Sequence, residues 1–334
     1  MKYRLTNFPV LPEAGAYDRA IESCADFFSR HPGIVSVYRI GSVSDPGISD
    51  LDVIAVFEDG ASCDADPLAA FSPGEKRLFT HSVFAISLKH FCDNLVFGGY
   101  RGYVRIWGRE LLEPGRADGE SPPGVLELRR QMAMEFLLAN VLARTADKYI
   151  GVLNVRGLLL SSKAVRWDLE LLGEDDGGLR SSIESAVEWR SRWFSRPPDR
   201  IALLAWFHDY HRRLLAYAER LSRQRPLFVP GVRRYAYGRN IRIRPGSPFR
   251  IAHRGIPLPL AVLPSGGLHR KAGRFLHRLD CRVPMKVSQD PLMRGRFAFY
   301  EEMAAHNRAR FPKFNILANP MVHRLTRSPD IRSR

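Results

Sequence analysis

The 334-residue chain predicts an α+β fold in which a mixed sheet with flanking helices precedes a helical bundle and a basic C-terminal region. Three observations predict this organisation. Short apolar runs rich in Val and Ile, which are typical of buried strands, lie in the first third. Apolar residues at helical spacing dominate the middle. The last third is rich in Gly, Pro and Arg. We therefore expect three regions at 1–113, 125–224 and 226–334.

The first region begins with an amphipathic helix at 15–31, which Pro32 and Gly33 end. Strands are predicted at 34–40 and 51–58, which are short and rich in Val and Ile.

A polar stretch at 59–76 contains several Gly and Pro residues and predicts a loop with a short helix. Two further strands are predicted at 78–88 and 102–107. Together with the first two, they would complete one sheet.

Two carboxylates, Asp50 and Asp52, stand one residue apart at the start of the second strand. Alternate side chains of a strand point to the same face, so both should project together. Carboxylates this close repel each other unless a cation lies between them, and oxygen ligands of this kind suit Mg²⁺. The first strand ends in Gly41 and Ser42. The glycine allows close approach of a ligand, and the serine offers a hydroxyl and an N–H to a phosphate.

Gly41 and Ser42, a polar spacer and the Ser-Asp-Leu-Asp run at 49–52 resemble the signature of the polymerase-beta-like nucleotidyltransferase superfamily, particularly its minimal and antibiotic-modifying members. The resemblance covers residues 15–112. It implies that Gly41, Ser42 and Ser49 bind the phosphates of a nucleoside triphosphate such as ATP, and that the two aspartates bind Mg²⁺ or Mn²⁺. The implied reaction transfers a nucleoside monophosphate to an acceptor hydroxyl and releases pyrophosphate.

The chain departs from the family pattern because its third predicted strand carries no carboxylate. Members of the family usually have a third acid there, and His81 and Ser82 stand near that position. Three interpretations remain open. One of Asp64, Asp66 and Asp93 folds into the site; or two carboxylates suffice, with His81 as the general base; or the site binds nucleotide without turnover.

The second region predicts four helices, at 125–146, 149–172, 178–194 and 199–223, after a Pro/Gly-rich linker at 114–124. Lys163 and Arg166 lie three residues apart and share a helix face. The resemblance implies that such basic residues contact the triphosphate. The alternative is a solvated face, or pairing with Asp168 and Glu170 nearby.

The third region carries almost all of the net positive charge, with 22 basic and 5 acidic residues at 226–334. Arg alternates with Tyr, Phe and Ile at 233–255, and a second basic cluster lies at 269–278. This pattern is typical of a surface for nucleic acid, another polyanion or anionic lipid headgroups, and also of a solvated face. The alternative function is therefore a catalytically inactive nucleotidyltransferase-like protein that binds nucleic acid or another polyanion.

One more helix is predicted at 290–311, before a basic tail.

The chain contains no apolar run long enough to predict a transmembrane helix or a signal peptide. Its four cysteines are widely spaced and form no metal-binding pair or disulfide framework: Cys24, Cys63, Cys92 and Cys281. We therefore expect a cytoplasmic protein.

Overall fold

The computed structural model describes residues 3–69, 71–98, 102–112, 123–173, 176–231, 234–237, 240–255 and 276–317. The predicted linker at 114–124, the cluster at 269–278 and the basic tail lie wholly or largely outside these ranges. The fold is mixed α/β with mixed sheets, which confirms the predicted class at that level.

The chain forms two compact units. The sheet unit contains the described residues of Val10–Leu128 and Gly295–Asn319. The helical unit contains those of Met1–Pro9 and Arg129–Arg294. No helix in the described part of the chain is both long and apolar enough to cross a bilayer.

The sheet unit is built on five strands, which lie in the order β13, β4, β3, β2, β5. Strand β2 is antiparallel to both β3 and β5, whereas β3, β4 and β13 are parallel to one another, so the sheet is mixed as predicted. The strand bounds are β2 (Ile34–Ile40), β3 (Asp52–Phe57), β4 (Phe84–Ser87), β5 (Val104–Gly108) and β13 (Asn315–Ile316).

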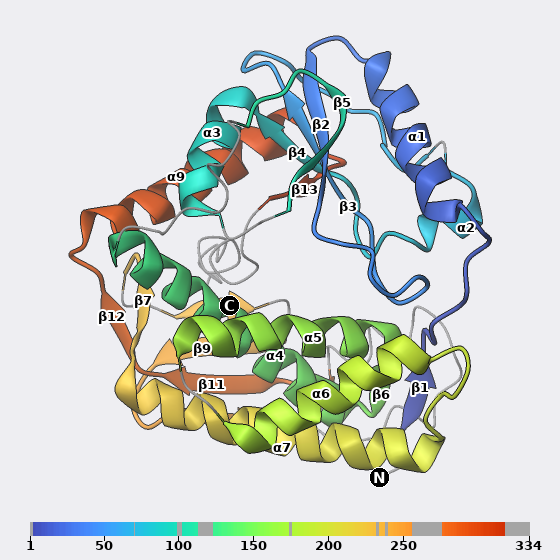
Figure 1. The fold of residues 1–334 in the computed structure, drawn as a ribbon. Helices are drawn as coiled ribbons and strands as arrows, with labels where there is room; N and C mark the ends of the chain where they lie inside the picture. Colours follow the sequence, from blue (N-terminus) through green and yellow to red (C-terminus); the bar gives the residue numbers. More distant parts are fainter. Residues whose placement is uncertain are drawn as a thin grey trace. The chain divides into compact units, whose positions relative to one another are not determined.

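Helices cover both faces of this sheet (Figure 1). Helix α1 (Ala16–Ser29) packs its buried residues Cys24 and Phe28 against Val53 and Phe57, on one face of β3. On the other face lie α3 (Leu88–Phe97) and α9 (Pro291–Arg310). There the ring of Phe91 stacks on Tyr38, with 5.5 Å between centroids. The alternation of side chains along β2 and β3 thus supplies an apolar surface to each layer.

The third predicted strand, at 78–88, is shorter than the sequence indicated. Residues 78–83 form turns and irregular backbone after the short helix α2 (Pro73–Lys76), and β4 occupies only four residues. The strand ends at Ser87 because the hydroxyl of Ser87 accepts a hydrogen bond from the backbone N–H of His90 and caps α3. His81 therefore lies on the segment that leads into β4, and α3 was not predicted.

The C-terminal helix returns to the sheet unit, which the sequence did not indicate. Beyond α9, the ring of Phe311 stacks on Phe57 with 4.6 Å between centroids. Within α9, Asn307 Nδ2 donates to the carbonyl of Ala85 at 2.6 Å. Strand β13 then pairs with β4 at the sheet edge. Residues from both ends of the described chain thus share one core.

The four predicted helices are all present, each close to its expected bounds: α4 (Pro123–Ile150), α5 (Val155–Leu172), α6 (Gly177–Arg192) and α7 (Arg200–Gln224). They belong to the helical unit, except for the first residues of α4, up to Leu128, which belong to the sheet unit. Side chains that favour helix starts set three of these boundaries. Asn154, Asp176 and Asp199 each accept a hydrogen bond from a backbone N–H in the first turn of α5, α6 and α7.

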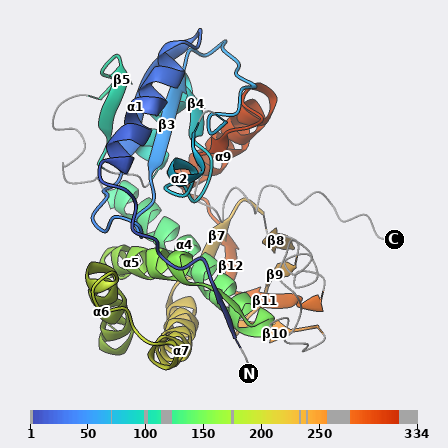
Figure 2. The same cartoon turned by 90° about the vertical axis from the view of Figure 1, so that its right-hand side faces the viewer.

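Two small parallel pairs and one larger sheet complete the helical unit. The pairs are β1 (Arg4–Thr6) with β6 (Val152–Asn154) and β7 (Leu227–Val229) with β12 (Met285–Val287). The larger sheet has the order β10, β11, β9, β8 and lies beside helices α4 to α7 (Figure 2). Its strands are β8 (Tyr235–Tyr237), β9 (Ile241–Pro245), β10 (Arg250–His253) and β11 (Leu279–Val283).

Candidate metal centre

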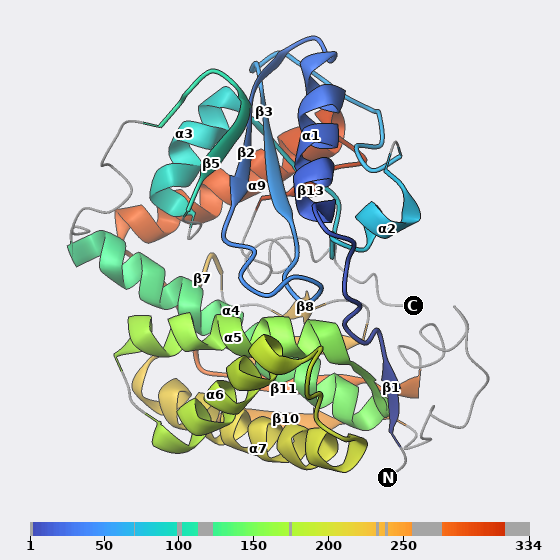
Figure 3. The same ribbon diagram turned by 45° about the vertical axis from the view of Figure 1, so that its right-hand side comes forward.

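The candidate site lies at the start of β3, beside the loop that joins β2 to β3 (Figure 3). Ile40, the last residue of β2, pairs in register with Asp52, the first residue of β3. Tyr17 of α1 holds this loop in place. Its hydroxyl donates to the carbonyl of Ser49 at 2.7 Å and accepts from the N–H of Gly47 at 3.1 Å. These two hydrogen bonds therefore anchor the loop to α1.

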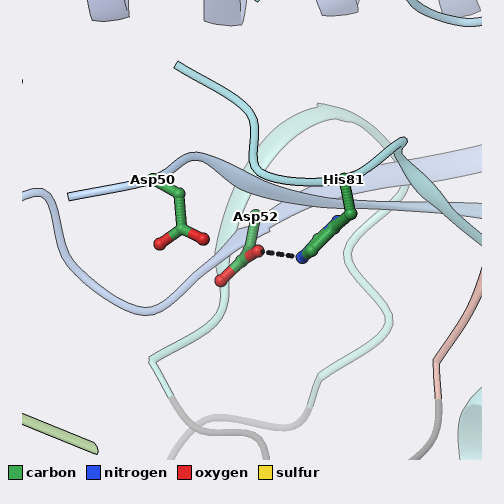
Figure 4. A group of neighbouring side chains, drawn as sticks. All are labelled: Asp50, Asp52 and His81. Atoms are coloured by element: carbon green, nitrogen blue, oxygen red, sulfur yellow. Dashed lines mark ion pairs between the residues drawn. The ribbon is translucent and has the colours of Figure 1, made fainter. Parts of the chain in front are cut away.

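Three side chains converge at this end of the sheet: Asp50, Asp52 and His81 (Figure 4). Each offers one ligand atom, and these atoms all lie within 4.8 Å of one another, so the group could hold a metal ion. His81 Nε2 lies 2.8 Å from Asp52 Oδ1, and both side chains are 31% exposed. The cluster is therefore partly enclosed and still open to a ligand from solvent.

Two contacts outside the cluster orient it. Thr80 Oγ1 donates to Asp50 Oδ2 at 2.6 Å. The backbone N–H of Leu51 donates to the carbonyl of Leu78 at 2.9 Å. Together these bonds join the segment before β3, which carries Asp50, to the segment before β4, which carries His81. They therefore fix the position of Asp50 relative to His81. Thr80 stands next to His81 in the sequence, but no motif marked it as a site residue.

The hydrogen bonds of His81 define its charge state. Its Nδ1 faces the carbonyl oxygen of Ser82 at 2.9 Å. A carbonyl only accepts, so Nδ1 carries a hydrogen. Its Nε2 faces the carboxylate of Asp52, which also accepts when ionised. With both acceptors facing the ring, this geometry favours the imidazolium form of His81 when no cation lies between Nε2 and the carboxylate.

The pKa shifts in the cluster agree with this arrangement. Burial raises the pKa of Asp50, the nearby charge of Asp52 raises it further, and the Thr80 hydrogen bond and His81 oppose the shift. For His81, burial acts to lower the pKa, but the hydrogen bond and charge of Asp52 outweigh it, so the pKa is raised. The cluster thus contains two carboxylates whose mutual repulsion only a positive group relieves.

The third position of the site is occupied by an imidazole rather than a carboxylate. Among the described residues, no acid joins Asp50 and Asp52 within ligand distance, so Asp64, Asp66 and Asp93 are not part of the cluster. Of the three interpretations that the sequence left open, this geometry excludes the first, in which a third acid joins the site, and it is compatible with both of the others. A general-base role for His81 stays a prediction.

The three residues expected to bind phosphate lie in the adjoining loop. Gly41 is exposed, has a φ of 72°, and has no atom within 4 Å of where a Cβ would stand, so a ligand can approach its backbone closely. Ser42 is exposed beside it. The hydroxyl of Ser49 is buried and accepts from the N–H of Asp45 at 3.1 Å, so it shapes the loop. Nucleotide binding by these residues stays a prediction.

Lys163 and Arg166 lie on α5, in the helical unit. Arg166 is exposed, and its guanidinium lies 3.4 Å from Glu170 and 3.7 Å from Glu184. These exposed ion pairs are weak, so they leave the arginine available to a phosphate. Contact of either residue with a triphosphate stays a prediction.

Carboxylate and imidazole ligands together suit Mn²⁺ and Zn²⁺ better than Mg²⁺, which prefers oxygen ligands alone. Comparison of the chain with models of protein families, with curated proteins and with solved structures gives no match. The resemblance to nucleotidyltransferases therefore rests on the sequence motif alone.

Proposed function

We propose that the protein is a metal-dependent nucleotidyltransferase. The observation that carries the proposal is the convergence of Asp50, Asp52 and His81 at the start of β3, next to the exposed residues Gly41 and Ser42. A pair of carboxylates can bind a divalent ion, and the exposed glycine-containing loop beside it can bind the phosphates that the ion accompanies.

In the proposed reaction, the hydroxyl oxygen of an acceptor attacks the α-phosphorus of a nucleoside triphosphate. The bond to the bridging oxygen breaks, pyrophosphate leaves, and the proton of the acceptor hydroxyl passes to solvent water. Asp50, Asp52 and His81 would hold Mn²⁺ or Mg²⁺. Such an ion neutralises phosphate charge and aligns the reacting groups.

The protein's own residues position the reactants. The N–H groups and hydroxyl at Gly41 and Ser42 would bind the terminal phosphates. Thr80 keeps Asp50 oriented through the 2.6 Å hydrogen bond. Lys163 and Arg166 remain candidates for further phosphate contacts.

The test is transfer of label from each of the four α-³²P-labelled nucleoside triphosphates, with Mn²⁺ and with Mg²⁺. Acceptors are pooled small molecules, RNA, a cell extract and the protein itself. We expect a labelled product with the wild type that disappears with Asp52→Asn and without divalent metal. The control is Asp93→Asn, an exposed carboxylate outside the cluster, which should transfer like the wild type.

Failure of the wild type to label any acceptor with any nucleotide, while Mn²⁺ binding depends on Asp52, would overturn transfer and leave a metal-binding site. Labelling by Asp52→Asn equal to the wild type would contradict the assignment of the site itself.

A further inference from the structure

Five arginines gather on one face of the four-stranded sheet in the helical unit. We call this surface the arginine face and define it by Arg242, Arg244, Arg250, Arg254 and Arg282. Four of the five side chains belong to exposed residues, and Arg244 is partly exposed. Asp280 is the one acidic residue that the described strands place on this face.

The strand register brings the arginines together. Arg250 pairs with Arg282, and Arg282 pairs with Arg244, so three guanidinium groups form a row across three adjacent strands. Arg242 stands two residues from Arg244 and therefore points to the same face. Adjacent strands are separated by about 4.8 Å, so the row places like charges close together.

Asp280 neutralises only part of this charge. Its Oδ2 lies 2.7 Å from Arg244 Nη2 and 3.3 Å from Arg254 Nε. Arg242, Arg250 and Arg282 form no ion pair with any acidic residue in the described ranges. Like charges directly opposite each other in a sheet destabilise it. Repulsion between these arginines therefore lowers the stability of the unbound protein, and a bound polyanion would relieve it.

The opposite face of the same sheet is apolar and covered. Ile243 and Cys281 alternate with the arginines along β9 and β11, Tyr235 of β8 pairs with Ile243, and all three are buried. The ring of His253 stacks on Tyr149 of α4, with 4.1 Å between centroids. The alternation of Arg with apolar and aromatic residues in the sequence is therefore the period of two of a half-buried strand, and Tyr235 is not available to stack on a base.

We propose that the arginine face binds the phosphate backbone of a duplex nucleic acid without sequence preference. Guanidinium groups match phosphate in charge and in hydrogen-bond geometry. A duplex exposes a dense line of phosphates and needs no stacking partner, whereas binding of single strands relies on aromatic platforms. The described strands place no aromatic or large aliphatic side chain on this face that would stack on a base or enter a lipid surface.

The test uses the full chain and a fluorescein-labelled 20-base-pair duplex, with binding followed by anisotropy from low to high salt. The variant Arg242→Gln/Arg250→Gln/Arg282→Gln removes the three unpaired charges. The matched control is Arg192→Gln/Arg212→Gln/Arg223→Gln, which removes three charges from exposed helix positions of the same unit.

We expect the arginine-face variant to bind at least about tenfold more weakly at 0.1 M salt. We also expect the slope of log K against log salt to fall in magnitude by about 3, because three phosphate contacts are lost. The control should keep the wild-type slope. The arginine-face variant should also melt at or above the wild-type temperature, since like-charge repulsion is relieved.

Equal slopes for the two triple variants would overturn the proposal, since net charge alone would then explain binding. Tighter binding of a single strand than of the duplex would overturn it as well. So would capture by vesicles containing phosphatidylserine without measurable binding of the duplex. None of these outcomes depends on nucleotidyl transfer, because Asp50, Asp52 and His81 are unchanged in both variants.

Discussion

Thr80 donates a hydrogen bond to Asp50, with 2.6 Å between Oγ1 and Oδ2. This bond connects the segment before β4 to the segment before β3 and fixes the orientation of the Asp50 carboxylate. Partners that orient a metal ligand influence affinity strongly even when they do not touch the metal. Thr80 is therefore a positioning residue in our description of the site.

Replacement of Thr80 tests this role. Thr80→Val keeps the shape of the side chain but cannot donate, so we expect Mn²⁺ affinity to fall about tenfold or more. Thr80→Ser retains the hydroxyl and should bind Mn²⁺ nearly as the wild type does. Isothermal titration calorimetry measures both. Equal affinities for the valine and serine variants would contradict a role for the hydrogen bond.

Replacement of Asp50 by Asn should affect the melting temperature in opposite directions without and with a divalent metal. Burial and the charge of Asp52 both disfavour ionisation of Asp50, so Asp50→Asn should melt at or above the wild-type temperature without divalent metal. In the presence of Mn²⁺ the wild type should melt at a higher temperature than the variant. Binding at 100 times Kd adds about 2.7 kcal/mol to wild-type stability, and the variant has lost this contribution. Thermal melts with EDTA and with Mn²⁺ measure both effects, and a wild type that Mn²⁺ does not stabilise would contradict the site.

The stability of the helical unit should decrease as the pH falls below about 6.5, the ordinary pKa of histidine. His211 is buried on α7, and its Nε2 lies 3.1 Å from Thr145 Oγ1. Burial first, and then the positive neighbours Lys148, His208 and Arg144, lower the pKa of His211 to about 4. Between these two values the unfolded chain binds a proton that the folded chain does not, so acid favours unfolding.

The loss should reach roughly 3 kcal/mol by pH 4, at about 1.4 kcal/mol per pH unit. His211→Gln cannot titrate, so its unfolding free energy should fall less steeply between pH 6.5 and 4.5. Urea unfolding at several pH values gives both curves. Other histidines contribute equally to both proteins, so parallel curves would show that His211 does not titrate as described.

Phe311 should be as important to the sheet unit as residues of its central strands. It is buried against Phe57, although the two are far apart in the sequence. Phe311→Ala should therefore lower the unfolding free energy by about 3–5 kcal/mol. Phe194→Ala, at a residue that is 43% exposed, should cost about 0.5 kcal/mol or less. Denaturant titrations compare them, and a near-neutral Phe311→Ala would contradict the placement of the C-terminal segment in this core.

Local patterns in the sequence were sufficient to predict much of the fold. Strands β2 and β3 were predicted from short apolar runs, and α1, α4 to α7 and α9 from helical spacing, with Pro32 and Gly33 marking the end of α1. The proximity of Asp50 and Asp52 also follows from local geometry, because alternate residues near a strand share a face. The length of β4 was wrong and α3 was missed, since Ser87 caps a helix inside a run whose apolar composition resembles a strand.

Everything that depends on pairing between distant segments was decided by the tertiary structure. The sequence by itself determined a carboxylate pair beside a Gly-Ser turn, but only the parallel pairing of β4 with β3 brings His81 and Thr80 to those carboxylates. Likewise, only the register of β9, β10 and β11 aligns Arg244, Arg250 and Arg282 in one row. The physical reason is that hydrophobic periodicity sets which face of an element is buried, whereas the choice of neighbour and register depends on contacts far apart along the chain.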